Sequence, residues 1–195
     1  DNDLQALRAE LARGDVAVLI VAGVNPVYDL PDSAGLVRDL ERVEHLVSVA
    51  DRLDETARLA HVVCPDHHYL ESWGDAEPVA GVVSLSQPTI RPMGDTRAFI
   101  ESLTAWSGVP QSAYDAVRAN WEQSIYPRAG AADLFSAFWN RTLERGVVEL
   151  TPTAEAPLVF SGDELSPVDR VAADAGPLAL VLYPKVAMRD GRHAH

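Results

Sequence analysis

The chain has 195 residues, enough for one domain of ordinary size or two small ones. Its 47% hydrophobic and 23% charged residues exclude a wholly disordered or fibrous chain. The 16 basic and 29 acidic residues give a net charge of −13, which argues against the cationic surfaces that bind nucleic acid or anionic membranes. This acidity indicates either a surface adapted to high salt or a merely acidic domain.

Cys64 is the sole cysteine of the sequence. The chain by itself therefore cannot build a disulfide, a four-cysteine zinc site or an iron–sulfur cluster. No apolar run approaches the length of a bilayer span, so we expect no direct membrane insertion. The start at Asp1 and the polar end at His195 indicate a fragment of a longer polypeptide.

Predicted helices and strands alternate over the first 65 residues. The apolar run at 16–22 is typical of a strand that is covered on both faces of a parallel sheet. Short links between alternating strands and helices predict βαβ units. Strands are predicted at 16–22, 45–50 and 62–64, and helices at about 3–13, 33–40 and 54–59, the last two capped by Asp32 or Ser33 and by Asp54.

The pattern changes from residue 72, where turn signals surround a short strand predicted at 82–85. Aromatic residues then recur at helical spacing, which favours core packing over a binding stripe. Helices are predicted at 95–106, capped by Asp95, at 112–124 and at 131–145, closed by Gly146; strands are predicted at 158–160 and 178–182. We therefore divide the chain into an α/β part (1–94), a helical insertion (95–146) and a return to the sheet with the start of a truncated segment (147–195).

The loop after the first strand is the most informative candidate site. Ligands of parallel sheets bind at the carboxyl ends of the strands. Gly23 would let the backbone approach a phosphate, and Asn25 before Pro26 can bond to backbone or ligand; a tight turn is the alternative. Asp51 ends the second strand, where it can bind a ribose or purine edge or cap the next helix.

Other polar clusters offer weaker chemistry. Cys64, His67 and His68 lack the second pair of ligands that zinc usually has, so no metal site is predicted. Glu71 and Asp75 could form an acid–base pair, but we favour Glu71 as an acceptor for backbone amides in an irregular loop. No catalytic residue is predicted.

Several stretches resemble a known family. Residues 19–29 resemble the GxNP strand–loop of molybdopterin oxidoreductases of the dimethyl-sulfoxide-reductase superfamily. Residues 47–57 and 60–65 are similar to the strand–Asp, TET and ADVVLP run of that family. Residues 68–75, with 81–92, resemble the molybdopterin-oxidoreductase-like, iron–sulfur-binding subunit of alternative complex III, a quinol-oxidising respiratory complex; the tail at 183–194 is similar to the segment just ahead of that subunit's final domain.

The resemblance implies a fold and a site. The fold is a Rossmann-like, doubly wound parallel sheet of the α/β class with a helical insertion. In the wider family this domain holds the guanosine end of a pterin dinucleotide. His61 and Cys64 depart from the family's usual aspartate and leucine. The positions that match the family's cofactor-binding residues are Gly23, Asn25, Pro26, Asp51 and Thr56.

From the resemblance we expect a fragment of a respiratory subunit that takes part in quinol oxidation and electron transfer, with this domain structural and without a cofactor of its own. The alternative is a genuine molybdopterin guanine dinucleotide-binding domain of an active molybdenum reductase or dehydrogenase. An independent nucleotide-binding domain is a third possibility. The resemblance further implies iron–sulfur clusters elsewhere in the parent chain. It also implies partner subunits in a membrane-bound complex on the extracytoplasmic face of a bacterial inner membrane.

Overall fold

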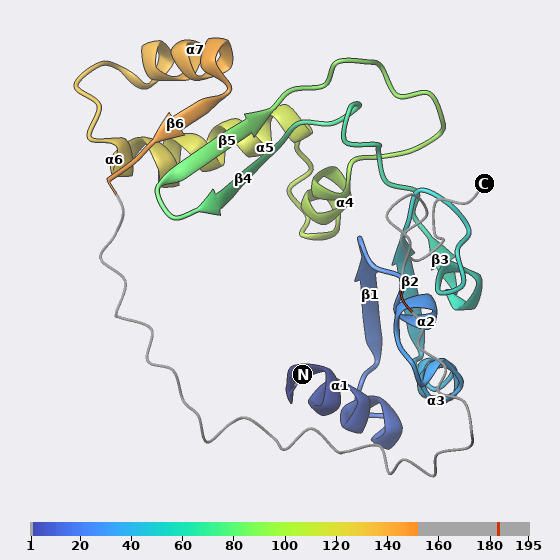
Figure 1. Ribbon diagram of the computed structural model, residues 1–195. Helices are drawn as coiled ribbons and strands as arrows, with labels where there is room; N and C mark the ends of the chain where they lie inside the picture. Colours follow the sequence, from blue (N-terminus) through green and yellow to red (C-terminus); the bar gives the residue numbers. More distant parts are fainter. Residues whose placement is uncertain (1, 152–182, 184–195) are drawn as a thin grey trace, which may run out of the picture. The chain divides into compact units, whose positions relative to one another are not determined.

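The computed structural model describes residues 2–151 and Tyr183. Its described part is mixed α/β, with one parallel and one antiparallel sheet of three strands each, in the orders β1-β2-β3 and β4-β5-β6 (Figure 1). The predicted strands at 158–160 and 178–182 lie outside the described residues. The elements are α1 Asn2–Arg13, β1 Val18–Ala22, α2 Pro26–Asp29, α3 Ser33–Leu40, β2 His45–Val49, η1 Ala57–Leu59, β3 Val62–Val63, β4 Gly74–Val79, β5 Val82–Ser86, α4 Phe99–Trp106, α5 Ala113–Asn120, η2 Trp121–Ile125, α6 Tyr126–Ala129, α7 Phe135–Arg145 and β6 Val147–Glu149.

The parallel sheet confirms the strands predicted in the first 65 residues. β2 lies between β1 and β3, and α1 and α3 cover one face of the sheet through a shared apolar core. The Asp32 side chain caps α3 by accepting a hydrogen bond from the Gly35 amide at 3.1 Å. Asp54 likewise accepts from the Ala57 amide at the start of η1, at 2.7 Å. The buried residues of this core are Leu11, Val21, Leu36, Leu40, Val43 and Leu46.

One expectation for β1 is wrong. Val18 and Ile20 are 55% and 41% exposed, so this strand is not covered on both faces in the structure. The cause is the alternation of a strand: Leu19 and Val21 turn toward α1 and α3, while Val18 and Ile20 point to the opposite side.

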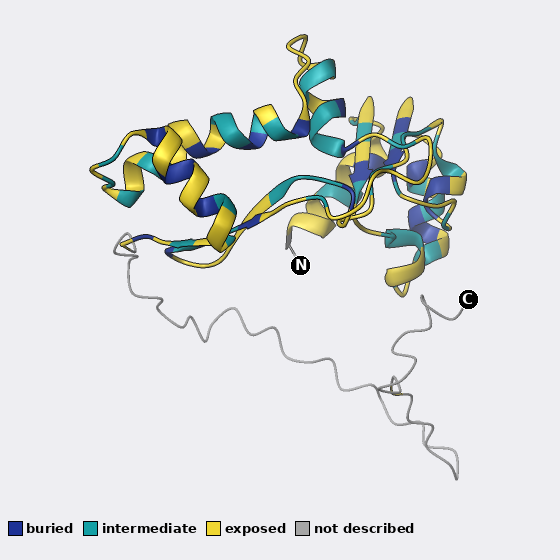
Figure 2. Cartoon of the chain, turned by 90° about the horizontal axis from the view of Figure 1, so that it is seen from above, coloured by how far each residue is buried: buried dark blue, intermediate teal, exposed yellow. Residues whose placement is uncertain are grey.

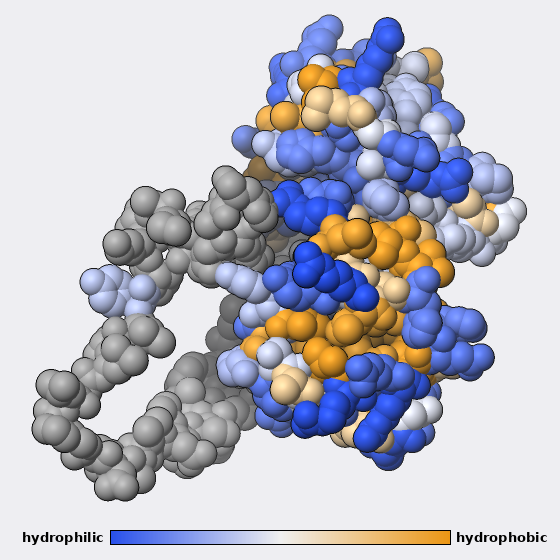
Figure 3. Space-filling view, turned by 90° about the vertical axis from the view of Figure 1, so that its right-hand side faces the viewer, coloured by the Kyte–Doolittle hydropathy of each residue, from blue (hydrophilic) through white to orange (hydrophobic). Residues whose placement is uncertain are grey.

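Exposed and buried positions are mapped along the chain in Figure 2, and Figure 3 shows hydrophobic residues gathered in patches on one face of the molecule.

The antiparallel sheet extends what the sequence predicted. β5 confirms the short strand at 82–85, but β4 and β6 pair on its two sides without having been predicted. β4 is hard to recognise because Pro78 and a register shift between Ala76 and Val79 break the regular alternation of a strand. β6 follows directly on Gly146, whose φ of +71° ends α7 in the left-handed region and turns the chain back to the sheet.

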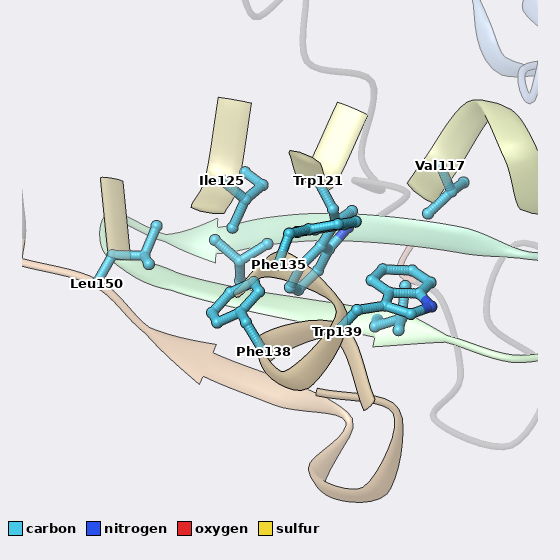
Figure 4. Close-up of a cluster of buried hydrophobic side chains, with 9 residues drawn as sticks. Val117, Trp121, Ile125, Phe135, Phe138, Trp139 and Leu150 are labelled. Atoms are coloured by element: carbon cyan, nitrogen blue, oxygen red, sulfur yellow. The ribbon is translucent and has the colours of Figure 1, made fainter. Parts of the chain in front are cut away.

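The helices that follow β5 share a second, aromatic core with that strand. Trp121, Phe138 and Trp139 meet between the helices and the sheet, as their side chains in Figure 4 show. The rings of Trp121 and Trp139 pack edge to face with centroids 5.8 Å apart. The helical spacing of the aromatics therefore did indicate a core. Its buried residues are Val83, Leu85, Val117, Trp121, Ile125, Phe135, Phe138, Trp139 and Leu150.

The helix ends correct three details of the prediction. The amide of Phe99, at the start of α4, donates to Asp66 Oδ1 at 2.8 Å, so Asp66 from a distant loop caps α4 in place of Asp95. The helix predicted at 112–124 continues through the π-helical η2 into α6. The last helix begins at Phe135 and not at residue 131.

A salt bridge between β4 and α6 makes a testable pH dependence. Arg128 donates to both carboxylate oxygens of Glu77 at 2.7 and 2.9 Å, and this guanidinium lowers the pKa of Glu77 from its ordinary 4.5 to about 2. Because the folded pKa is depressed, the stabilising contribution is present above pH 4.5 and is lost as the pH falls toward about 2. We expect the carboxyl carbon of Glu77 to titrate near pH 2 by NMR, and to return toward 4.5 in Arg128→Gln. A Glu77 midpoint that is the same in both proteins would contradict the ion pair.

Candidate functional site

The candidate residues lie at the carboxyl edge of the parallel sheet. β1 and β2 run parallel, with Ala22 beside Val49, so the loops that follow the two strands leave the sheet at the same edge. Gly23 directly follows β1. Asp51 follows β2, with Ala50 between them. Pro26 starts α2, where its missing amide hydrogen costs no helical hydrogen bond. Backbone topology therefore places the two loops that carry the predicted site on one edge.

Asn25 and Thr56 are joined directly across this edge. The Asn25 Oδ1 atom accepts from the Thr56 hydroxyl at 2.7 Å and from the Thr56 amide at 3.3 Å. The Asn25 Nδ2 atom donates to Glu55 Oε2 at 2.7 Å. This hydrogen bond is the main reason why the pKa of Glu55 is lowered. Asn25 therefore holds the loop after β2 with both ends of its amide.

Thr56 completes the link in the other direction. Its side chain is 1% exposed, and its hydroxyl oxygen accepts from the Val27 amide at 3.2 Å while its hydrogen goes to Asn25. The buried Thr56 hydroxyl thus both donates and accepts a hydrogen bond within the protein. Glu55 is not among the predicted site residues, because spacing along the chain cannot show a partner 30 residues away.

Gly23 is the open part of the edge. Its φ of +68° is in the left-handed region, which an L side chain adopts only with strain. Apart from the adjoining residues of the chain, no atom of the described residues lies within 4 Å of the position that a Cβ would take there, so the glycine is required by the turn and not by crowding. The exposed backbone at Gly23 leaves room for the close approach of a ligand.

Asp51 is engaged by its own neighbour. Arg52 donates through Nε to Oδ1 and through a terminal nitrogen to Oδ2, each at 3.0 Å. The Arg52 guanidinium holds the pKa of Asp51 below its ordinary value. The structure thus brings Asn25 and Thr56 together, whereas the described contacts of Asp51 run to Arg52 and not to that pair.

The remaining candidates have structural partners. Glu71 accepts from the amides of His68 and Met93, each at 3.1 Å, which confirms its predicted role as an acceptor in an irregular loop. Asp75 instead accepts from the indole nitrogen of Trp121 at 2.8 Å, so the two carboxylates are held in different hydrogen-bond networks. His61 Nδ1 accepts from the Leu46 amide at 3.0 Å.

The described residues hold neither a cluster of metal ligands nor a membrane-spanning helix. Residues 2–151 and Tyr183 contain no group of three or more histidine, cysteine, aspartate or glutamate side chains that could hold a metal ion. Among the same residues, no helix has both the length and the apolar character needed to cross a membrane.

Comparisons with known proteins agree on one family. The model of the family described as molybdopterin oxidoreductase matches residues 2–107. The menaquinone reductase, molybdopterin-binding-like subunit of Nitratidesulfovibrio vulgaris is 31% identical over 200 residues, covering 99% of this chain and 28% of the relative. The NADPH-Fe(3+) oxidoreductase subunit alpha of Geobacter sulfurreducens is 27% identical over 181 residues, covering 93% of this chain and 20% of the relative.

A solved structure with a similar fold is acetylene hydratase from Pelobacter acetylenicus. Its TM-score is 0.58 at 16% identity, and the match covers 76% of this chain and 21% of that chain. The chain spans 28% and 20% of the lengths of the two curated relatives. In all three comparisons, the matching stretch is a minor part of a longer polypeptide.

Proposed function

Because the chain belongs to the molybdopterin oxidoreductase family, we propose that it is part of a redox subunit in which this domain is a structural module without a pterin of its own. One curated relative is the molybdopterin-binding-like subunit of a menaquinone reductase, and another is the alpha subunit of an NADPH-Fe(3+) oxidoreductase. The parallel sheet would then be the retained Rossmann-like, doubly wound core of the family's cofactor domain.

The observation that carries this proposal is that the predicted cofactor-binding side chains already form hydrogen bonds within the protein. The amide oxygen of Asn25 already accepts two hydrogen bonds from Thr56, and its amide nitrogen donates to Glu55. Both oxygens of Asp51 accept from Arg52. A guanosine that bonded to the Asn25 oxygen would have to displace Thr56, since that oxygen already accepts two hydrogen bonds and a buried threonine hydroxyl left unpaired is unfavourable. The bonds between Asn25 and Thr56 support the structural role, whereas the open turn at Gly23 leaves room for a ligand.

The parent assembly is proposed from the resemblance and the named relatives. Residues 68–75 and 81–92 resemble the corresponding subunit of alternative complex III. One curated relative is a menaquinone reductase subunit. We propose a respiratory complex in which the parent chain meets other subunits at the extracytoplasmic face of a bacterial inner membrane. Iron–sulfur clusters would lie in parts of the parent chain beyond these 195 residues.

The alternative is a genuine molybdopterin guanine dinucleotide-binding domain. The left-handed, unobstructed backbone at Gly23 and the place of Asp51 at the end of a parallel strand favour it. In that case Gly23, Asn25, Pro26, Asp51 and Thr56 would hold the guanosine end after exchanging their present partners. A bound pterin would supply a molybdenum centre for two-electron chemistry.

Molybdenum and pterin content separates the two functions. The complete subunit, purified with its complex, is expected to contain far less than one molybdenum per chain by mass spectrometry, with no guanine nucleotide released on denaturation. One molybdenum per chain would contradict the structural proposal. The Asp51→Ala variant is the control. Its molybdenum content should fall if the metal is held at this edge, and should stay the same if the molybdenum is adventitious.

A further inference from the structure

His61 engages both backbone groups of one residue in the neighbouring strand. Its amide donates to the carbonyl oxygen of Leu46 at 2.8 Å, and its imidazole Nδ1 accepts from the Leu46 amide at 3.0 Å. In a regular parallel ladder, a backbone carbonyl of β3 or of the residue before it would accept from that amide. The chain is still closing η1 at that point, since the Ala60 amide donates to the Ala57 carbonyl. The imidazole therefore takes the place of a backbone acceptor at the start of β3.

This acceptor works in one protonation state of the ring. Nδ1 accepts a hydrogen bond when the imidazole is neutral and carries its hydrogen on Nε2. A protonated imidazole carries a hydrogen on both nitrogens, so it would face the Leu46 amide donor to donor. Histidine is the side chain that ordinarily titrates between about pH 5 and pH 8. His61 is exposed, so its ring can exchange a proton with solvent without any opening of the fold.

The charged groups that flank this contact come from two elements. At the start of β2, Glu44 and His45 are close to each other, with His45 Nε2 3.6 Å from Glu44 Oε1. In η1 the charged residue is Arg58, and β1, on the far side of β2, has none. His61 itself forms no ion pair within residues 2–151. No carboxylate of these residues is therefore bonded to the ring in a way that would reward its protonation.

Few other bonds hold β3 in the sheet. The strand consists of Val62–Val63 and lies at one end of the strand order β1-β2-β3, so β2 is its one partner among the described strands. Just beyond it, the Cys64 amide donates to the Ser48 carbonyl at 2.8 Å. The bond from the Leu46 amide is thus a substantial part of what fixes this strand. Segments held by few hydrogen bonds open more often than the rest of a fold.

We propose that His61 is a proton-sensitive latch between β2 and β3. With a neutral ring the latch is closed, and β3 stays paired with β2. When the ring is protonated, the Leu46 amide loses its acceptor and β3 opens more often. The chain at 64–73 leaves the sheet from β3, next to the strand β2 that Asp51 follows, so acid loosens this side of the candidate site. The latch acts within the sheet itself and does not depend on the proposed function.

Hydrogen exchange on the complete subunit tests the latch. Exchange is compared at about pH 8 and about pH 5.5, on either side of the ordinary histidine range, after correction for the intrinsic exchange rate. Peptides that span 45–49 and 60–64 should open about twofold to tenfold more often at the lower pH, the range for loss of one ordinary hydrogen bond. His61→Asn should abolish this change, because the amide oxygen accepts a hydrogen bond at either pH.

Two further variants separate the latch from a general effect of acid. His45→Asn is the matched control, because His45 is also exposed at this pair of strands but its ring lies near Glu44 and not on a backbone amide. It should keep the full pH response. His61→Leu removes the acceptor, so its peptides should exchange faster already at about pH 8. A wild type without the pH response, a His61→Asn variant that keeps it, or a His61→Leu variant as protected as the wild type would overturn the proposal.

Discussion

Replacement of Trp121 by alanine is expected to lower the free energy of unfolding by about 3 to 5 kcal/mol, the range for truncating a fully buried tryptophan. The indole packs edge to face with Trp139 and lies against Phe138, so its loss leaves a cavity between the helices and the antiparallel sheet. The substitution also leaves Asp75 without the hydrogen bond from the indole nitrogen.

The two cores share no buried residue, which makes the expected effect local. In hydrogen-exchange measurements on the complete subunit, amides of β5, α5 and α7 should exchange faster in Trp121→Ala, while those of β1 and β2 keep their protection. Trp106→Ala is the matched control, because that tryptophan of α4 is exposed. Uniform loss of protection across both cores would contradict the separation.

Replacement of Thr56 by valine is expected to cost about 1 to 3 kcal/mol although the two side chains have nearly the same shape. The Val27 amide loses its acceptor, and Asn25 Oδ1 loses the hydroxyl donor. Thr56 itself is buried, so water does not readily replace these bonds. Thermal or chemical unfolding of the variant measures the loss.

Thr56→Ser separates the hydroxyl from the methyl group. Serine retains the oxygen that bonds Asn25 and Val27, so this variant should lose less stability than the valine variant does. If the serine variant were the less stable of the two, packing of the methyl group would matter more than the hydrogen bonds. The link between the two loops would then not be what holds the candidate site.

The parallel sheet could be predicted because its information is local. The apolar runs around Val21 and Val47, the cap at Asp32 and the alternation with helices each fall within a few residues of the feature they specify. The exposure of Val18 and Ile20 could not be predicted. An apolar run indicates a strand, but it does not show which faces of that strand other elements cover.

The features that were missed depend on partners far along the chain. The cap of α4 comes from Asp66, 33 residues before Phe99. β6 has three residues and is defined by pairing with β5, more than 60 residues earlier. For the candidate site, the sequence grouped Asn25 with Thr56 only through the family resemblance, and their role in holding a cofactor stays a prediction. It could not show that they bond to each other, or that Arg52 engages Asp51.

The pairing of β5 with β6 has a consequence for how this fold can vary. Ser84 lies beside Val147, so the helical segment between these strands leaves and returns at neighbouring points of one sheet. Its length is therefore decoupled from the geometry of the parallel sheet. Doubling a closed loop costs only about 0.6 kcal/mol in closure entropy. Helices could be gained or lost here during evolution while the strand ends near Gly23 and Asp51 kept their positions.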